Sequence, residues 1–154
     1  MSWTDSLLLI PYQSVGPVVF GATREQIVRL VGESTDVFSR GERSDTDSVE
    51  VYDSESGSVQ IHYSRSDNKC VAVEVEHPSQ FIVYGQNLNG LTEHQVLAWI
   101  GKYDNTYEAD SSGFISRRCG LGVYWEYVNA EDGGEDKLIV VSAIGVCPGY
   151  FDPK

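Results

Sequence analysis

The stretches GATREQIVRLVG, residues 21–32, and GLTEHQVLAWIG, residues 90–101, carry the same signals for the start and end of a short helix. In each stretch a threonine stands three positions before a glutamine, which is the spacing of a capping box at a helix N-terminus. Apolar residues then recur at helical spacing, and a glycine follows the last of them, as it often does at the end of a helix. We therefore expect two matching helices of about two turns each, near residues 23–31 and 92–100.

Runs typical of β-strands follow each predicted helix. In one of them, Val59, Ile61 and Tyr63 alternate with polar residues, which indicates a strand with one buried face. Each half of the chain should thus be a helix followed by an antiparallel β-meander, because neither helix is long enough for a series of parallel crossovers. The predicted strands are 47–53, 57–64 and 69–76 after the first helix, and 113–119, 120–128 and 137–144 after the second.

These patterns predict an α+β fold of two tandem repeats. The whole chain, residues 1–154, has the length of a single domain, and the repeats fall at about 16–80 and 85–146. A unit of about 65 residues cannot easily bury both a helix and a sheet face, so the two copies are expected to share one core. The side chains expected in that core are Ile27, Leu30, Ile61, Val73, Trp99, Ile100 and Val140.

A helix that ends in LVG or WIG and leads into a strand meander, twice in one chain, resembles the tandem-repeat fold of β-lactamase inhibitor protein and related small bacterial modules. The resemblance covers most of the chain and rests on short motifs. It implies a fold and a protein-binding role. The known inhibitor of this type is exported and disulfide-bonded, which this sequence does not match, so the resemblance transfers no individual binding residue.

The charge of the chain is strongly negative, with 23 acidic and 11 basic residues and a formal charge of −12. This balance argues against binding to nucleic acid or to an anionic membrane, because both attract basic patches. The excess lies in residues 33–56 and 104–136, each with eight acidic and two basic residues. Two solvated surface regions would explain such segments, and so would an acidic face that binds a basic protein.

Three aromatic residues lie on one predicted strand within the second acidic segment. Alternation along the strand places Tyr124 on the opposite face from Trp125 and Tyr127. Exposed rings beside acidic loops would supply the affinity of a protein-binding surface, whereas a sheet covered on both faces would bury them. The candidate partner-binding residues are Asp45, Asp47, Tyr124, Trp125, Tyr127, Glu131 and Asp132.

The sequence shows no motif for catalysis or for a bound metal. His62, His77 and His94 do not form a metal-binding pair, and His62 is expected on the outward side of its strand. There is no phosphate loop and no GxSxG nucleophile elbow. Cys119 follows two arginines, which would favour a reactive thiolate, but a buried strand residue is the simpler interpretation. We therefore predict no catalytic residue, no metal ligand and no cofactor.

The three cysteines, Cys70, Cys119 and Cys147, are an odd and dispersed set, which is typical of reduced thiols in the cytoplasm. The N-terminal sequence shows no secretory signal, and no apolar run approaches the length of a membrane span. We therefore expect a cytoplasmic protein.

Three classes of function fit these features. The first is a non-enzymatic binding module of bacterial type, comparable to an immunity or inhibitor protein, that captures a basic protein. The second is a structural or regulatory protein of another kind, and the third is a small enzyme. The sequence makes no prediction of the oligomeric state.

Overall fold

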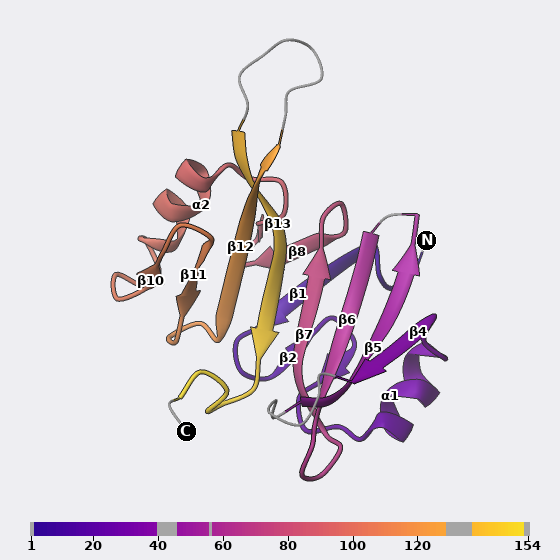
Figure 1. Cartoon of the computed structure of the whole chain (residues 1–154). Coiled ribbons are helices and arrows are strands. Elements are labelled where there is room, and N and C mark those ends of the chain that lie inside the picture. The colour runs from indigo at the N-terminus through magenta and orange to yellow at the C-terminus, as the bar shows by residue number, and fades with distance from the viewer. Residues whose placement is uncertain (1, 40–45, 56, 129–136, 153–154) are drawn as a thin grey trace.

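The computed structural model describes residues 2–39, 46–55, 57–128 and 137–152 (Figure 1). In these residues the protein is a mixed α+β structure with two short helices and two sheets, in which nearly all neighbouring strands are antiparallel. The α+β class and the antiparallel sheet are therefore as predicted.

The two helices are α1 (Arg24–Val31) and α2 (Glu93–Ile100). Both begin with the predicted capping box. The threonine before each helix accepts a hydrogen bond from the glutamine backbone N–H, at 3.2 Å in α1 and 3.1 Å in α2, and the glutamine side chain accepts from the threonine N–H at 3.0 Å in both. The ends differ, because Gly32 has a φ of 93° whereas Gly101 keeps a right-handed φ of −58°. Only Gly32 thus needs the conformational freedom of glycine.

The larger sheet has eight strands in the order β10-β11-β12-β13-β7-β6-β5-β4, all antiparallel to their neighbours. The strands after α1 fill one half of this sheet and the strands after α2 fill the other, and β7 and β13 join the two halves. The strands are β4 (Asp36–Ser39), β5 (Thr46–Ser54), β6 (Gly57–Ser64), β7 (Cys70–Glu76), β10 (Glu108–Ala109), β11 (Gly113–Ser116), β12 (Leu121–Val128) and β13 (Lys137–Val146).

A second, smaller sheet has the order β3-β2-β1-β8-β9, with β1 and β8 parallel. Our sequence analysis missed this sheet, since most of its strands have only two residues and lack a measurable alternation. Three of its strands come before α1 in the chain, and the other two come just before α2. They are β1 (Ser6–Ile10), β2 (Ser14–Val15), β3 (Val18–Val19), β8 (Gln80–Val83) and β9 (Gln86–Asn87).

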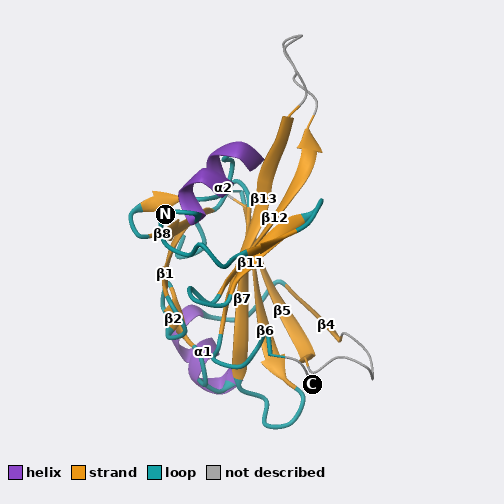
Figure 2. Cartoon of the chain, turned by 90° about the vertical axis from the view of Figure 1, so that its left-hand side faces the viewer, coloured by secondary structure: helices purple, strands orange, loops and turns teal. Residues whose placement is uncertain are grey.

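Both helices and the small sheet lie on one side of the large sheet (Figure 2). We call this side of the large sheet its inner face and the opposite side its outer face. The core fills the space between the two layers, where Leu7 and Phe81 of the small sheet and Ile61 and Val73 of the large sheet are fully buried. The two sheets therefore share one core.

The predicted core residues are buried with one exception. Leu30 is 62% exposed, so that prediction was wrong. The stripe of α1 that faces the sheet runs through Arg24, Ile27 and Val31, since Arg24 reaches a carboxylate of β5 on the inner face. Leu30 lies about 100° around the helix from Val31 and so points away from the core.

One further side chain lies deeper than expected. His62 is 1% exposed, although the sequence pattern placed it on a solvent-facing side of its strand. Cys119 is buried as expected, at 1% exposed, and its N–H donates to the Ser116 hydroxyl at 3.1 Å, which fits a structural residue. Cys70 is likewise a buried thiol, and burial raises its pKa to about 12.

In the part of the chain that the structure describes, neither helix has the length and apolar character to cross a membrane.

Candidate protein-binding face

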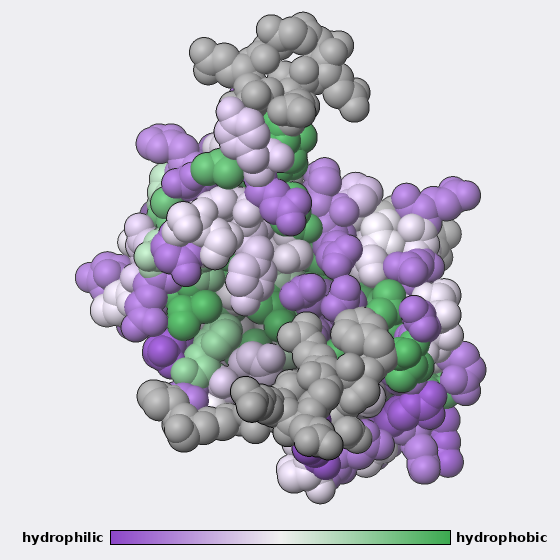
Figure 3. All heavy atoms as spheres, viewed as in Figure 1, coloured by the Kyte–Doolittle hydropathy of each residue, from purple (hydrophilic) through white to green (hydrophobic). Residues whose placement is uncertain are grey.

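The outer face of the large sheet brings polar side chains from five strands into one line. The strand registers place Asp53 opposite Ser58, Ser58 opposite Glu76, Glu76 opposite Ser142, and Ser142 opposite Tyr124. Strands in a sheet lie about 4.8 Å apart, so this line extends across about 20 Å. We call it the outer-face row. Figure 3 views this face, where hydrophilic residues are interspersed with apolar ones.

Three carboxylates gather on or beside the outer-face row. The pKa of Glu76 is raised, first by burial and then by the negative charges of Asp53 and Glu126. The Gln60 amide donates a hydrogen bond to Glu76 at 2.9 Å, which orients this carboxylate without neutralising it. Asp53 and Glu126 are exposed. The three side chains therefore create a negative potential that a positively charged ligand would relieve.

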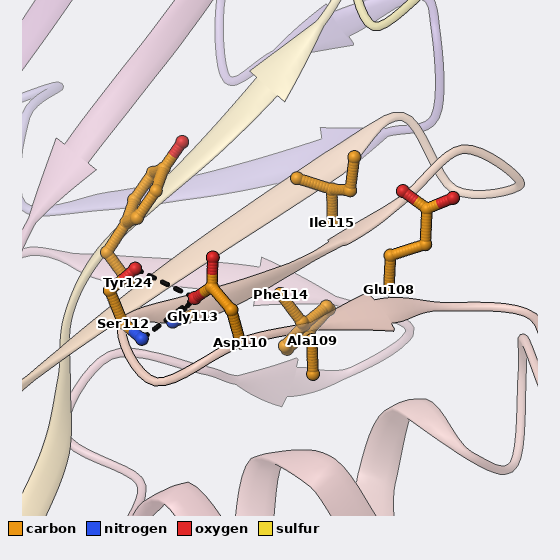
Figure 4. Close-up of a pocket in the computed structure, with 8 residues that line it drawn as sticks. All are labelled: Glu108, Ala109, Asp110, Ser112, Gly113, Phe114, Ile115 and Tyr124. Carbon is orange, nitrogen blue, oxygen red and sulfur yellow. Dashed lines mark hydrogen bonds between the residues drawn. The ribbon is translucent and has the colours of Figure 1, made fainter.

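A small hollow lies at the β12 end of the outer-face row, and Tyr124 belongs to both. The hollow has a volume of about 200 Å³, and Figure 4 shows Tyr124 at one end of it and Glu108 at the other. Its other lining residues come from β10, β11 and the turn between them; they are Ala109, Asp110, Ser112, Gly113, Phe114 and Ile115.

Hydrogen bonds from its own turn hold Asp110 in place at the hollow. Its Oδ1 accepts from the backbone N–H and the hydroxyl of Ser112, both at 2.8 Å, and from the Gly113 N–H at 3.1 Å. These bonds, led by the one from the Ser112 backbone, lower the pKa of Asp110, so this carboxylate is ionised. Gly113 is required at this point because a Cβ would lie 2.0 Å from the Val123 carbonyl oxygen.

The three candidate aromatic residues do not form a single cluster. Tyr124 is 39% exposed on the outer face, as the hypothesis requires. Trp125 is 5% exposed, and its indole N–H donates to the Ser111 carbonyl at 2.9 Å, so it is a core residue and that assignment was wrong. Tyr127 is 66% exposed, but it lies on the inner side, in a depression beside α2 that Leu97 also lines. Strand β12 extends past the core at Tyr127, so the ring of Tyr127 is exposed although it points to the inner side.

The candidate acidic residues fall largely in segments whose structure is not described. Asp45, Glu131 and Asp132 lie outside the described residues. Asp47 belongs to β5, but the description does not extend to its side chain. Their part in a binding surface therefore stays a prediction.

Two carboxylates of the predicted acidic segments are buried and belong to the core. Glu50 is fully buried and accepts a hydrogen bond from Arg24 Nε at 2.7 Å. Asp104 is 1% exposed and accepts from Thr106 N–H at 2.8 Å and from Ser116 Oγ at 2.7 Å. Burial alone would raise the pKa of Asp104, but hydrogen bonds from the Thr106 hydroxyl, the Ser116 hydroxyl and the Thr106 N–H outweigh it, and the pKa is lowered. The charge count along the sequence overstated the surface charge because it carries no information on depth.

Sequence reasoning missed Glu76, which lies in neither acidic segment. A signal for it was present, since Val73 was expected in the core and the predicted strand 69–76 alternates, so Glu74 and Glu76 fall on the face opposite Val73. That pattern places Glu76 on the outer face, where the structure has it.

Comparisons of the chain with protein-family models, with curated proteins and with solved structures give no match. Within the described residues, no group of three or more histidine, cysteine or acidic side chains is arranged to hold a metal ion.

Proposed function

We propose that this protein is a non-enzymatic binding module of the immunity or inhibitor type, and that the outer face of its large sheet binds a basic segment of another protein. The observation that carries the proposal is Glu76, a half-buried carboxylate whose pKa two neighbouring negative charges help to raise. No ion pair between described residues involves Asp53, Glu76 or Glu126. This arrangement disfavours the folded state, and a positively charged partner would compensate it.

The hollow at Tyr124 supports a specific mode of binding. Asp110 offers a carboxylate at the hollow, and Glu108 offers a second one that forms an exposed ion pair with Arg117 at 3.5 Å. A cation of the partner would compete with Arg117 for Glu108, and the ring of Tyr124 lines the same hollow. A volume of about 200 Å³ accepts one long side chain rather than a whole ligand. We therefore infer that an arginine or lysine of the partner enters the hollow while neighbouring basic residues lie along the outer-face row.

We further propose that the chain arose from two tandem repeats, as in the β-lactamase inhibitor protein-like fold that the sequence resembles. Each helix precedes a four-stranded antiparallel meander, and the two meanders meet through their last strands. The residue before each helix makes an equivalent isolated bridge, Thr23 to Lys69 and Thr92 to Ile139. These pairs are offset by 69 and 70 positions, which supports repeats over residues 16–80 and 85–146.

The proposal is tested by exposing immobilised bait proteins to an extract from the native source. The extract is cytoplasmic, because the dispersed thiols lead us to place the protein in the cytoplasm. One bait is the natural chain. A second bait, the outer-face triple variant, carries Asp53→Asn, Glu76→Gln and Glu126→Gln.

The matched control bait carries Glu25→Gln, Glu33→Gln and Asp67→Asn, three exposed carboxylates of α1, its C-terminal flank and the β6–β7 turn. Both triple variants change the net charge by the same amount. We expect a basic protein to bind the natural and control baits at low salt and to be lost from the outer-face triple variant. Equal capture by all three baits would contradict the proposal, and capture of nothing would favour a structural or regulatory role.

A further inference from the structure

The small sheet presents a second surface, and this one is uncharged. None of its five strands contains a charged residue, although 22% of the residues in the chain are charged. Its outward-facing positions are also unusually apolar. Leu8, Ile10 and Val19 are 50%, 44% and 56% exposed. A sheet that faces solvent normally alternates apolar residues inward with polar residues outward, so this face has the composition of a surface that is covered.

The exposed aliphatic side chains follow one line across the small sheet, interrupted at β2 by the polar Ser14, which is 8% exposed. Ile10 lies opposite Ser14, which lies opposite Val19, and Leu8 lies opposite the half-buried Ile82. These side chains share the face of the small sheet that is turned away from the core. The strip thus crosses four strands, from β8 to β3.

The strip continues from β3 onto α1. A groove of about 490 Å³ lies between them, and both Val19 and Leu30 line it. Leu30 is the most exposed of these side chains, at 62%. We call Leu8, Ile10, Val19, Leu30 and Ile82 together the apolar strip. Its exposed apolar area is on the order of 300 Å², which reaches the size at which patches on monomeric proteins are often functional.

We propose that the apolar strip is the interface of a homodimer, in which it packs against the same strip of a second copy. The charge of the chain favours this occupant over a different protein with a charged surface. A chain with a formal charge of −12 repels its own copies. A two-fold interface places identical patches against each other, so a self-interface must avoid like charges. The small-sheet part of the strip is uncharged over all five strands and meets this condition, whereas the α1 part has the exposed Arg29 next to Leu30 in the chain.

The geometry suits such a dimer. Two sheets pack face to face at about 10 Å with interdigitated aliphatic side chains, and the outward residues of β1, β3 and β8 supply these. An area on the order of 300 Å² per copy is below the roughly 800 Å² per partner of a standard interface. Polar side chains at the rim, such as Ser6, Gln26 and Gln80, must add to it, and the dimer is expected to dissociate on dilution. The outer faces of the two large sheets then point away from each other, and the dimer is bivalent.

The test is sedimentation velocity of the full chain from about 1 µM to about 1 mM, the range in which weak interfaces dissociate. The natural chain should pass from monomer to dimer within this range. Leu8→Asp should raise the dissociation constant at least about tenfold, because it places a negative charge from each copy within an apolar interface. A mixture of Leu8→Asp with Leu8→Lys should restore a dimer, since the two copies then carry opposite charges.

The control is Val128→Asp, which changes a residue 41% exposed at the far end of β12 and should leave the dissociation constant unchanged. Circular dichroism should show that all variants fold. A natural chain that stays monomeric at about 1 mM would overturn the proposal and assign the strip to a different partner. A dimer that Leu8→Asp and Val128→Asp affect equally would also overturn it. The outer-face triple variant should dimerise normally, so failure of the proposed partner binding and failure of this interface are distinguishable.

Discussion

Replacing Glu76 by glutamine should make the protein more stable at neutral pH. The substitution keeps the shape of the side chain and its ability to accept the hydrogen bond from Gln60, which is 2.9 Å long. It removes a charge that burial and the neighbours Asp53 and Glu126 all disfavour. A residue that is unfavourable for folding is expected where a surface has been selected for binding.

The size of the effect follows from the position of Glu76. The side chain is half-buried and its neighbours are exposed, so solvent screens each repulsion to about 0.2–0.5 kcal/mol. Two neighbours and partial desolvation together give about 0.5–1 kcal/mol at pH 7. For a chain of this length, that raises the melting temperature by about 1–4 °C.

The effect of the substitution on stability should depend on pH. Because the pKa of Glu76 is higher in the folded than in the unfolded state, the protonated form favours folding. The penalty is absent below the unfolded pKa of about 4.3 and appears as pH rises through the folded pKa. Urea unfolding at pH 7 and at about pH 3.5 should therefore show a stabilised variant only at pH 7. A variant that is less stable than the natural chain at pH 7, or equally stabilised at both pH values, would refute this reasoning.

Three further predictions concern the core and can be checked by urea unfolding. Ile100→Ala should cost about 2–5 kcal/mol, whereas Leu30→Ala should cost less than about 0.5 kcal/mol, because Ile100 is fully buried and Leu30 is 62% exposed. Arg24→Met should cost about 3 kcal/mol, since it leaves the buried Glu50 without its cation, and adding Glu50→Gln should recover part of the loss. Asp104→Asn should lower the free energy of unfolding by about 1.5–3 kcal/mol at pH 7. Because the pKa of Asp104 is lowered in the folded state, the stability that this carboxylate contributes is present above its unfolded pKa and is lost as pH falls through its folded pKa. The destabilisation caused by the substitution should therefore shrink at low pH.

Local signals in the sequence predicted the local structure well. The capping boxes before α1 and α2 depend on residues close together in the chain, and the structure has both of them. The alternation predicted for β6 holds from Val59 to Ile61 and breaks at His62, which is also buried. The strands β2, β3 and β9 were missed because two residues cannot show a period. Their place in a sheet depends on pairing with distant segments.

Depth was the main property that sequence patterns did not reveal. Glu50 and His62 alternate as outward residues would in an isolated strand, yet both are buried. Trp125 and Tyr127 lie on the same side of β12, but only Trp125 is covered, since the core ends between them. Alternation in the sequence places Glu76 on the outer side of its strand, but its neighbours Asp53 and Glu126 come from distant strands, and only the strand registers bring the three together.

The central claim is that the outer face of the large sheet binds a basic protein. The most direct measurement is the association rate of the captured partner with the natural chain, the outer-face triple variant and the control triple variant, as ionic strength rises. At about 0.01 M salt, where the Debye length is about 30 Å, the outer-face triple variant should associate at least about tenfold more slowly than the control. The difference should disappear near 1 M salt, where the Debye length is about 3 Å. Equal rates for the two triple variants at low salt would contradict the claim.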